Sequence, residues 1–282
     1  RIKGGAQWVA IKAPGYGQHR SELLGDICVL TGATLSSAST GVALDKLTLQ
    51  EQPPVAALLD DLDPDVLLRR VSAAGRAIAY ANDEAWYRVG RATASRRSLN
   101  PVRRLRSTRP ERAPLAEGVV VQDGEAVLAV DARPDRDPVL LLRAAAAAAQ
   151  AGLRLSPYAV ARLASESAPL PEPWPIAARD SLISLLGAGR AAIPVWEALD
   201  QADLISRLIP EWKVVRSAPQ RNPVHRFTVD RHLVETAVNA SSLTREVSRP
   251  DLLLVGALLH DIGKGQAGDH TEVGVRIVSE LA

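Results

Sequence analysis

The stretch LLLVGALLHDIGKG, residues 252–265, decides both the fold class and where a functional site is sought. The apolar run from Leu252 to Leu259 predicts a buried helix, and it ends in the doublet His260-Asp261. A glycine-flanked turn with Lys264 follows at once. A buried carboxylate without a partner loses much of its hydration free energy, and a divalent metal ion would offset that loss.

A third ligand for such an ion lies upstream. His232 is on a segment whose apolar residues recur at helical spacing. Two imidazoles and one carboxylate form a mixed nitrogen and oxygen set, which is expected for Mn²⁺, Fe, Zn²⁺ or, with more water, Mg²⁺. Such an ion lowers the pKa of a bound water and holds a phosphoryl oxygen, and Lys264 is placed to meet phosphate as a point charge. A simple cap or hydrogen-bonded pair at His260-Asp261 stays open as an alternative, and His225 alone predicts no role.

Composition limits the function classes. The 282 residues are 46% hydrophobic and 23% charged, as in soluble globular proteins. Apolar runs fall short of the roughly 20 residues of a membrane span, so we expect no membrane association. With 34 basic and 32 acidic residues the net charge is +2, and we expect no nucleic-acid partner. The single cysteine, Cys28, favours a reducing cytoplasm. The absence of methionine, even at position 1, predicts a piece of a longer protein.

The first half of the chain predicts mixed elements. Residues 1–50 have the pattern of a small α/β segment, and Val55–Val89 has helical apolar spacing. Seven arginines lie between Ser95 and Arg112. A phosphate-binding surface is one interpretation. A solvated loop is favoured, because no aromatic residue is interleaved for base stacking.

The centre of the chain predicts a hairpin and then helices. Two β-rich runs, Val119–Gln122 and Glu125–Leu128, flank Asp123-Gly124, which suits a two-residue primed turn. The glycine-containing sequence GAGRAA (187–192) is similar to a dinucleotide-binding loop. It follows a predicted helix rather than a strand, which favours an interhelical turn. Helices are expected over Leu140–Ala151 after a cap at Asp137, after Ser156-Pro157, over Ile176–Leu186 and over Pro194–Ala202.

The sequence motifs around the histidines resemble those of a known protein family. The order His232, then His260-Asp261, resembles the HD metal-dependent phosphohydrolase superfamily. More specifically, NPVHRFTVDRHL (222–233), LLHDIGKG (258–265) and GDH (268–270) are similar to the HD domain of bacterial bifunctional PII uridylyltransferase/uridylyl-removing enzymes. The resemblance extends back through Pro194–Asp200 and the hairpin to about Val55.

This resemblance implies a site and a reaction. His232, His260 and Asp261 would be ligands of a divalent ion, Mn²⁺ or Mg²⁺. Lys264 would contact the phosphate, and His270 would lie at the metal centre or position the leaving group. The implied reaction is hydrolysis of the uridylyl-tyrosine phosphodiester on PII, a nitrogen-regulatory protein. Water activated at the metal attacks phosphorus, the tyrosyl oxygen leaves, and UMP is released.

The chain also departs from that family. The transferase half of these enzymes uses a glycine-rich loop with an Asp-x-Asp pair, and the sequence contains neither, so uridylyl transfer is not expected. The distal aspartate of an HD site is expected beyond residue 282, and the glutamine-sensing ACT domains are absent. Two alternatives stay open: an HD phosphohydrolase acting on a free nucleotide, and a non-catalytic fragment that binds polypeptide.

The N-terminal segment resembles a different family. VAIKAPGYG (9–17) and LLGDICVLTG (23–32) are similar to part of the apical domain of group I chaperonins, although no chaperone activity is assigned to them. The expected fold is mainly α: a helical linker region with one β-hairpin leads into an all-α HD domain, preceded by a small α/β segment. The expected domains are 1–52 (α/β), 53–116 (helix and Arg-rich loop), 117–221 (hairpin and helices) and 222–282 (HD domain, truncated at its C-terminal end).

Overall fold

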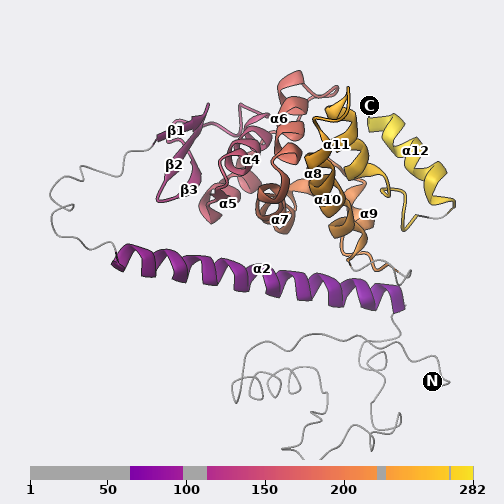
Figure 1. Ribbon diagram of the computed structural model, residues 1–282, viewed down its shortest axis with the longest axis horizontal. Helices are drawn as coiled ribbons and strands as arrows, with labels where there is room; N and C mark the ends of the chain where they lie inside the picture. The colour runs from indigo at the N-terminus through magenta and orange to yellow at the C-terminus, as the bar shows by residue number, and fades with distance from the viewer. Residues whose placement is uncertain (1–63, 98–112, 221–226, 267, 282) are drawn as a thin grey trace, which may run out of the picture. The chain divides into compact units, whose positions relative to one another are not determined.

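The computed structural model describes residues 64–97, 113–220, 227–266 and 268–281 (Figure 1). This part is mainly helical, as predicted, and contains one four-stranded sheet. The predicted α/β segment, its chaperonin resemblance, His225 and most of the Arg-rich stretch lie outside the described residues. The domain boundaries therefore stay predictions.

The sheet contains the predicted hairpin. Strands β2 (Val119–Gln122) and β3 (Glu125–Leu128) pair antiparallel, and Gln122 is opposite Glu125. Asp123 and Gly124 both have positive φ, 53° and 78°, which is the backbone of a primed turn. Strand β1 (Ala113–Ala116) pairs antiparallel with β2, and β4 (Arg154–Leu155) pairs parallel with β3. These two outer strands are too short to leave a recognisable pattern in the sequence.

Three helices pack against this sheet, namely α4 (Leu140–Gln150), α5 (Pro157–Glu166) and α7 (Ala192–Gln201), and α6 (Ile176–Gly187) packs on α4. Helix α5 begins as predicted, because Ser156 Oγ accepts a hydrogen bond from the Ala159 N–H at 3.1 Å. Helix α4 begins later than predicted, because the carboxylate and carbonyl of Asp137 close a preceding turn with the next N–H groups. The predicted interhelical turn is present at Gly189, where φ is 62°.

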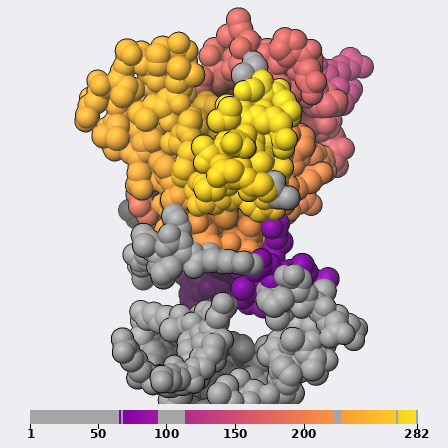
Figure 2. Space-filling model, turned by 90° about the vertical axis from the view of Figure 1, so that its right-hand side faces the viewer, coloured from indigo at the N-terminus to yellow at the C-terminus, as the bar shows by residue number. Residues whose placement is uncertain are grey.

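After α7, the elements of the described residues are all helices: α8 (Leu204–Leu208), α9 (Trp212–Val215), α10 (Val229–Ala240), η3 (Ser241–Leu243), α11 (Pro250–Leu259) and α12 (His270–Leu281). Helices α10 and α11 pack against each other (Figure 1), and α12 lies at the surface (Figure 2). The expectation that α11 is buried is wrong for one of its faces. Leu254, Leu258 and Leu259 are buried, but Leu252 is 59% exposed, because neighbouring elements cover only one side.

Helix α2 (Pro64–Arg97) confirms the predicted helix over its described part and extends three residues into the stretch predicted as a loop. Its residues Arg69 and Arg76 contact the rest of the described chain, whereas Ile78 and Trp86 are 71% and 67% exposed. Its contacts with the core are thus largely polar. Among the described residues, no single helix has both the length and the apolarity to cross a membrane; α6 with the η2–α7 segment (Gly189–Gln201) meets both criteria only as a pair, bent by 109°.

Candidate metal centre

Three predicted ligands converge where α10 meets the end of α11. His232 is the fourth residue of α10, His260 caps the C-terminal end of α11, and Asp261 follows it. One possible ligand atom from each residue lies within 4.8 Å of the others. Asp261 Oδ2 is 3.7 Å from His232 Nε2 and 3.3 Å from His260 Nε2. The packing of α10 on α11 therefore assembles the set that the sequence predicts.

The His260 ring is oriented for ligation. His260 Nδ1 lies 2.9 Å from the Ala257 carbonyl oxygen. Because a carbonyl only accepts, Nδ1 carries the proton and Nε2 keeps its lone pair for an ion. The rings of His232 and His260 meet edge to face, with centroids 5.1 Å apart. The side chains of His232, His260 and Asp261 are 26%, 38% and 12% exposed, so the cluster is open to solvent on one side.

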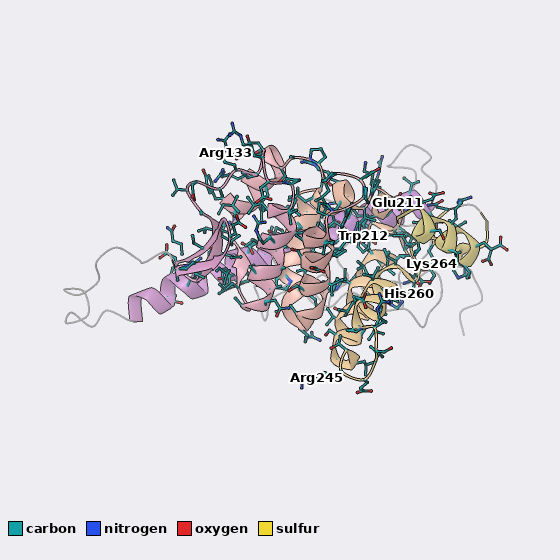
Figure 3. All side chains as sticks on the ribbon, turned by 90° about the horizontal axis from the view of Figure 1, so that it is seen from above. Arg133, Glu211, Trp212, Arg245, His260 and Lys264 are labelled. Carbon is teal, nitrogen blue, oxygen red and sulfur yellow. The ribbon has the colours of Figure 1, made fainter. Side chains whose placement is uncertain are left out.

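Lys264 contacts this cluster directly. Its Nζ is 2.6 Å from Asp261 Oδ2 and donates to Gln220 Oε1 at 3.2 Å. Burial alone would raise the pKa of Asp261, but the hydrogen bond from Lys264 and the nearby positive charges lower the pKa below its ordinary value. Asp261 is thus ionised at neutral pH, the form that binds a metal. Figure 3 shows His260 and Lys264 at the same end of the molecule.

His270 lies outside this three-residue cluster. It is exposed at the first position of α12, and its catalytic role stays a prediction. The neighbouring Asp269 has a structural role, because its Oδ1 accepts hydrogen bonds from the N–H groups of Thr271 and Glu272 at 2.9 and 3.2 Å. These backbone hydrogen bonds lower the pKa of Asp269. Asp269 therefore caps the start of α12.

The backbone of the turn after Asp261 packs closely against the start of α12. A Cβ at Gly263 would lie 2.2 Å from the His270 carbonyl oxygen and 2.6 Å from the Gly274 nitrogen. Only a glycine permits this close approach of two backbones. The position of Lys264, one residue further on, depends on that contact.

The donor set fits a divalent ion. Two imidazole nitrogens and one carboxylate oxygen suit Mn²⁺, Fe or Zn²⁺, and Mg²⁺ would need additional oxygen ligands or water. Gln220 is a neighbour of the site that the sequence did not single out. It lies two residues before the recognised motif, and its only signal there is this proximity.

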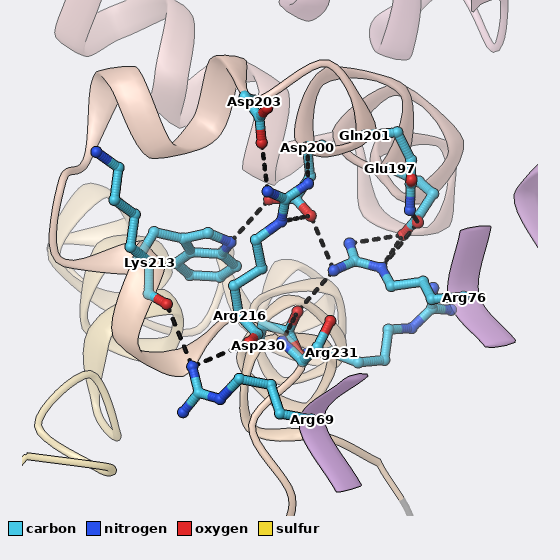
Figure 4. Close-up of polar contacts among 12 residues, drawn as sticks. Arg69, Arg76, Glu197, Asp200, Gln201, Asp203, Lys213, Arg216, Asp230 and Arg231 are labelled. Carbon is cyan, nitrogen blue, oxygen red and sulfur yellow. Dashed lines mark hydrogen bonds and ion pairs between the residues drawn. The ribbon is translucent and has the colours of Figure 1, made fainter. Parts of the chain in front are cut away.

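A second group of charges was also missed by sequence reasoning. It consists of Arg76 from α2, Glu197 and Asp200 from α7, Arg216, and Asp230 from α10, and is called the ion cluster below (Figure 4). The side chains of Asp200 and Asp230 have no exposed area. Burial raises the pKa of Asp200, and the charges of Arg76 and Arg216 oppose that rise. Asp230 is two residues before His232, so the two groups share the start of α10.

Comparison with known proteins finds a family match over the segment that contains the three candidate ligands. Residues 229–282 match the HD domain family. A bifunctional uridylyltransferase/uridylyl-removing enzyme of Streptomyces coelicolor is 58% identical over 250 residues, covering 86% of this chain and 30% of the relative. Enzymes with the same name from Mycobacterium tuberculosis and Corynebacterium glutamicum are 46% and 40% identical. They cover 85% and 61% of this chain, and 29% and 24% of those relatives.

The resemblance predicted from the sequence is thereby confirmed over most of the chain. The chain spans about 30% of the length of its Streptomyces relative. No solved structure is significantly similar to it.

Proposed function

We propose that this chain, a homologue of one segment of the bifunctional uridylyltransferase/uridylyl-removing enzymes, contributes metal-dependent phosphodiester hydrolysis that removes UMP from uridylylated PII. The observation that carries the proposal is the convergence of His232, His260 and Asp261 inside the segment that matches the HD family. The removing reaction, rather than the transfer reaction, is assigned to this chain because the three candidate ligands lie in its HD-family segment. The single Cys28 is consistent with a cytoplasmic setting.

The residues of the site have distinct roles in this proposal. His232, His260 and Asp261 would hold Mn²⁺ or Mg²⁺, which when bound lowers the pKa of water and polarises a phosphoryl oxygen. The Lys264 ammonium, now 2.6 Å from Asp261, would meet a phosphate oxygen as a point charge. The exposed edge of the two histidines leaves room for a tyrosyl phosphodiester on a protein. His270 would position the leaving tyrosyl oxygen.

The test is UMP release from uridylylated PII by the full chain, with and without Mn²⁺. We expect release with Mn²⁺, loss of release after chelation, and a loss of about 100-fold or more in His260→Ala, because a ligand is removed. Arg245→Ala is the matched control: Arg245 is exposed in the same helical region and away from the ligands (Figure 3). It should release UMP at the wild-type rate.

Other outcomes separate the alternatives. Hydrolysis of free nucleotides without release from PII would favour a small-molecule HD phosphohydrolase. Metal-independent binding of polypeptide, with neither activity, would favour a non-catalytic fragment. Unchanged metal content and unchanged UMP release in His260→Ala would contradict the proposed site itself.

A further inference from the structure

We propose that Arg76 is a positioning residue for the metal centre: acting through Asp230, it holds the first turn of α10 and thereby the His232 ring. This inference rests on the proposed metal-binding function of His232. It assigns a role to helix α2, which lies outside residues 229–282 that match the HD family.

Asp230 ties three segments together at the start of α10. Its Oδ2 accepts hydrogen bonds from Arg76 Nη1 at 2.6 Å and from the Ser217 N–H at 2.8 Å, and its Oδ1 accepts one from the Arg231 N–H at 2.9 Å. Both oxygens therefore have fixed donors. Because the His232 N–H bonds the Thr228 carbonyl in the same turn at 2.9 Å, a shift of Asp230 would also move His232.

Arg76 has the geometry to fix Asp230 rather than merely neutralise it. Its Nε and Nη2 donate to both carboxylate oxygens of Glu197 at 2.8–3.0 Å. Its Nη1 lies 2.8 Å from Asp200 Oδ2 in addition to its bond with Asp230. The planar guanidinium is thus clamped on α7 and directs one nitrogen at α10, which a lysine ammonium cannot reproduce.

Arg216 does not duplicate this function. It contacts the side chains of Asp200 and Asp203 and the carbonyl oxygen of Asp200. Among the contacts of the described residues, Arg76 is the cation that reaches the Asp230 carboxylate. Without it, Asp230 and Asp200 would be like charges buried beside one another, and Asp230 would relax toward water and take the first turn of α10 with it.

The experiment measures Mn²⁺ affinity by calorimetry on the full chain. We expect Arg76→Ala and Arg76→Lys to bind Mn²⁺ about 10- to 100-fold more weakly, the usual effect of losing a partner that orients a ligand. Arg76→Lys keeps the charge and serves if Arg76→Ala fails to fold. Arg70→Ala, an exposed position on the same helix, should bind as the wild type does.

A second pair of measurements separates positioning from a general loss of stability. Glu197→Gln removes the charge of Glu197 but keeps a side-chain amide oxygen that can accept from Arg76, and Asp200 Oδ2 still contacts Arg76 Nη1 at 2.8 Å. Arg76 therefore stays directed at Asp230, and we expect a lower thermal midpoint with Mn²⁺ affinity within about twofold of wild type. In the metal-free chain, the NMR signals of the His232 ring should move in Arg76→Lys while those of His260 stay in place.

Three outcomes would overturn a claim. If the wild type does not bind Mn²⁺, the proposed function fails. If the wild type binds and both Arg76 variants bind equally well, the positioning role alone fails. If Glu197→Gln loses as much affinity as Arg76→Lys, the effect is general destabilisation, and the route through Asp230 is wrong.

Discussion

The ion cluster and the metal centre are both built around carboxylates near α10, yet they treat those carboxylates differently. In the ion cluster, the Asp200 and Asp230 side chains have no exposed area, and their oxygens have close N–H donors. In the metal centre, Asp261 Oδ2 is paired with Lys264 at 2.6 Å and faces two imidazole nitrogens at 3.3 and 3.7 Å, and the His232 and His260 side chains are 26% and 38% exposed.

The difference separates the charges that stabilise the fold, in the ion cluster, from those that are available to bind a ligand, in the metal centre. A fully hydrogen-bonded buried pair has no capacity left for a ligand, and breaking it leaves an uncompensated charge. In the metal centre the two histidines and Lys264 are partly exposed, so their side chains can move aside or exchange water for a ligand. Asp230, which holds the fold, and His232, which belongs to the metal centre, are only two residues apart on α10.

Deleting one carboxylate from each group gives the largest expected contrast. Asp200→Ala removes the acceptor for Arg76, Arg216 and the Trp212 indole N–H, and should lower the free energy of unfolding by about 3–5 kcal/mol. Asp261→Ala should cost about 1 kcal/mol or less, because the Lys264, His232 and His260 side chains that it leaves behind are 25%, 26% and 38% exposed and can be hydrated. Urea denaturation of both variants measures the contrast, and equal losses would remove the distinction between the two groups.

Adding metal tests the open group alone. At about 100 times its Kd, Mn²⁺ should raise the free energy of unfolding of the wild type by about 2.7 kcal/mol. The increase should vanish in His260→Ala and after chelation, and persist in Arg245→Ala. A stabilisation that survives in His260→Ala would show that the ion binds elsewhere.

The turn behind the metal centre should be the next most sensitive position. Gly263→Ala forces a Cβ against the backbone of His270 and Gly274, and should cost about 1–3 kcal/mol as an overpacked contact. Gly75→Ala is the matched control, because nothing lies within 4 Å of a Cβ there and alanine favours a helix interior by about 0.5–1 kcal/mol. Thermal unfolding of both should move in opposite directions; a neutral Gly263→Ala would mean that the turn is loosely held.

The exposed ion pair between Arg249 and Asp251 should have the smallest effect on stability of the charged groups compared here. The Arg249 side chain donates to both carboxylate oxygens of Asp251 at 2.7–3.0 Å, and this hydrogen bonding lowers the pKa of Asp251 to about 2 from the ordinary 3.8. A lowered pKa stabilises the fold above the ordinary value, and that contribution is lost as the pH falls from about 4 through about 2. NMR titration should give a pKa of about 2 for Asp251, and Arg249→Gln should move that pKa back toward 3.8. A pKa that does not change in Arg249→Gln would show that the ion pair is not what lowers it.

Local signals predicted much of the fold and the core of the site. The Asp123-Gly124 turn and the Ser156 cap are local chemistry, so the elements they start or connect are confirmed. The ligands were predicted because His260-Asp261 ends an apolar helix, where a buried charge requires a partner. The same reasoning failed for Leu252, since an almost uniformly apolar helix gives no indication of which face neighbours leave open.

The supporting residues were beyond local reasoning. Arg76 is 121 residues from Glu197 and 154 from Asp230, and no periodicity or motif connects them. Gln220 is 44 residues from Lys264. Such pairs follow only from the packing of α2, α7 and α10.

The ion cluster also determines where this polypeptide can be cut. Similarity to the HD family begins at Val229, immediately before Asp230. A module excised there, or grafted into a chimera at that junction, would carry the Asp230 carboxylate away from Arg76 and from the Ser217 amide. The unit recognised by sequence similarity is thus smaller than the unit that can be moved intact, which extends back to α2.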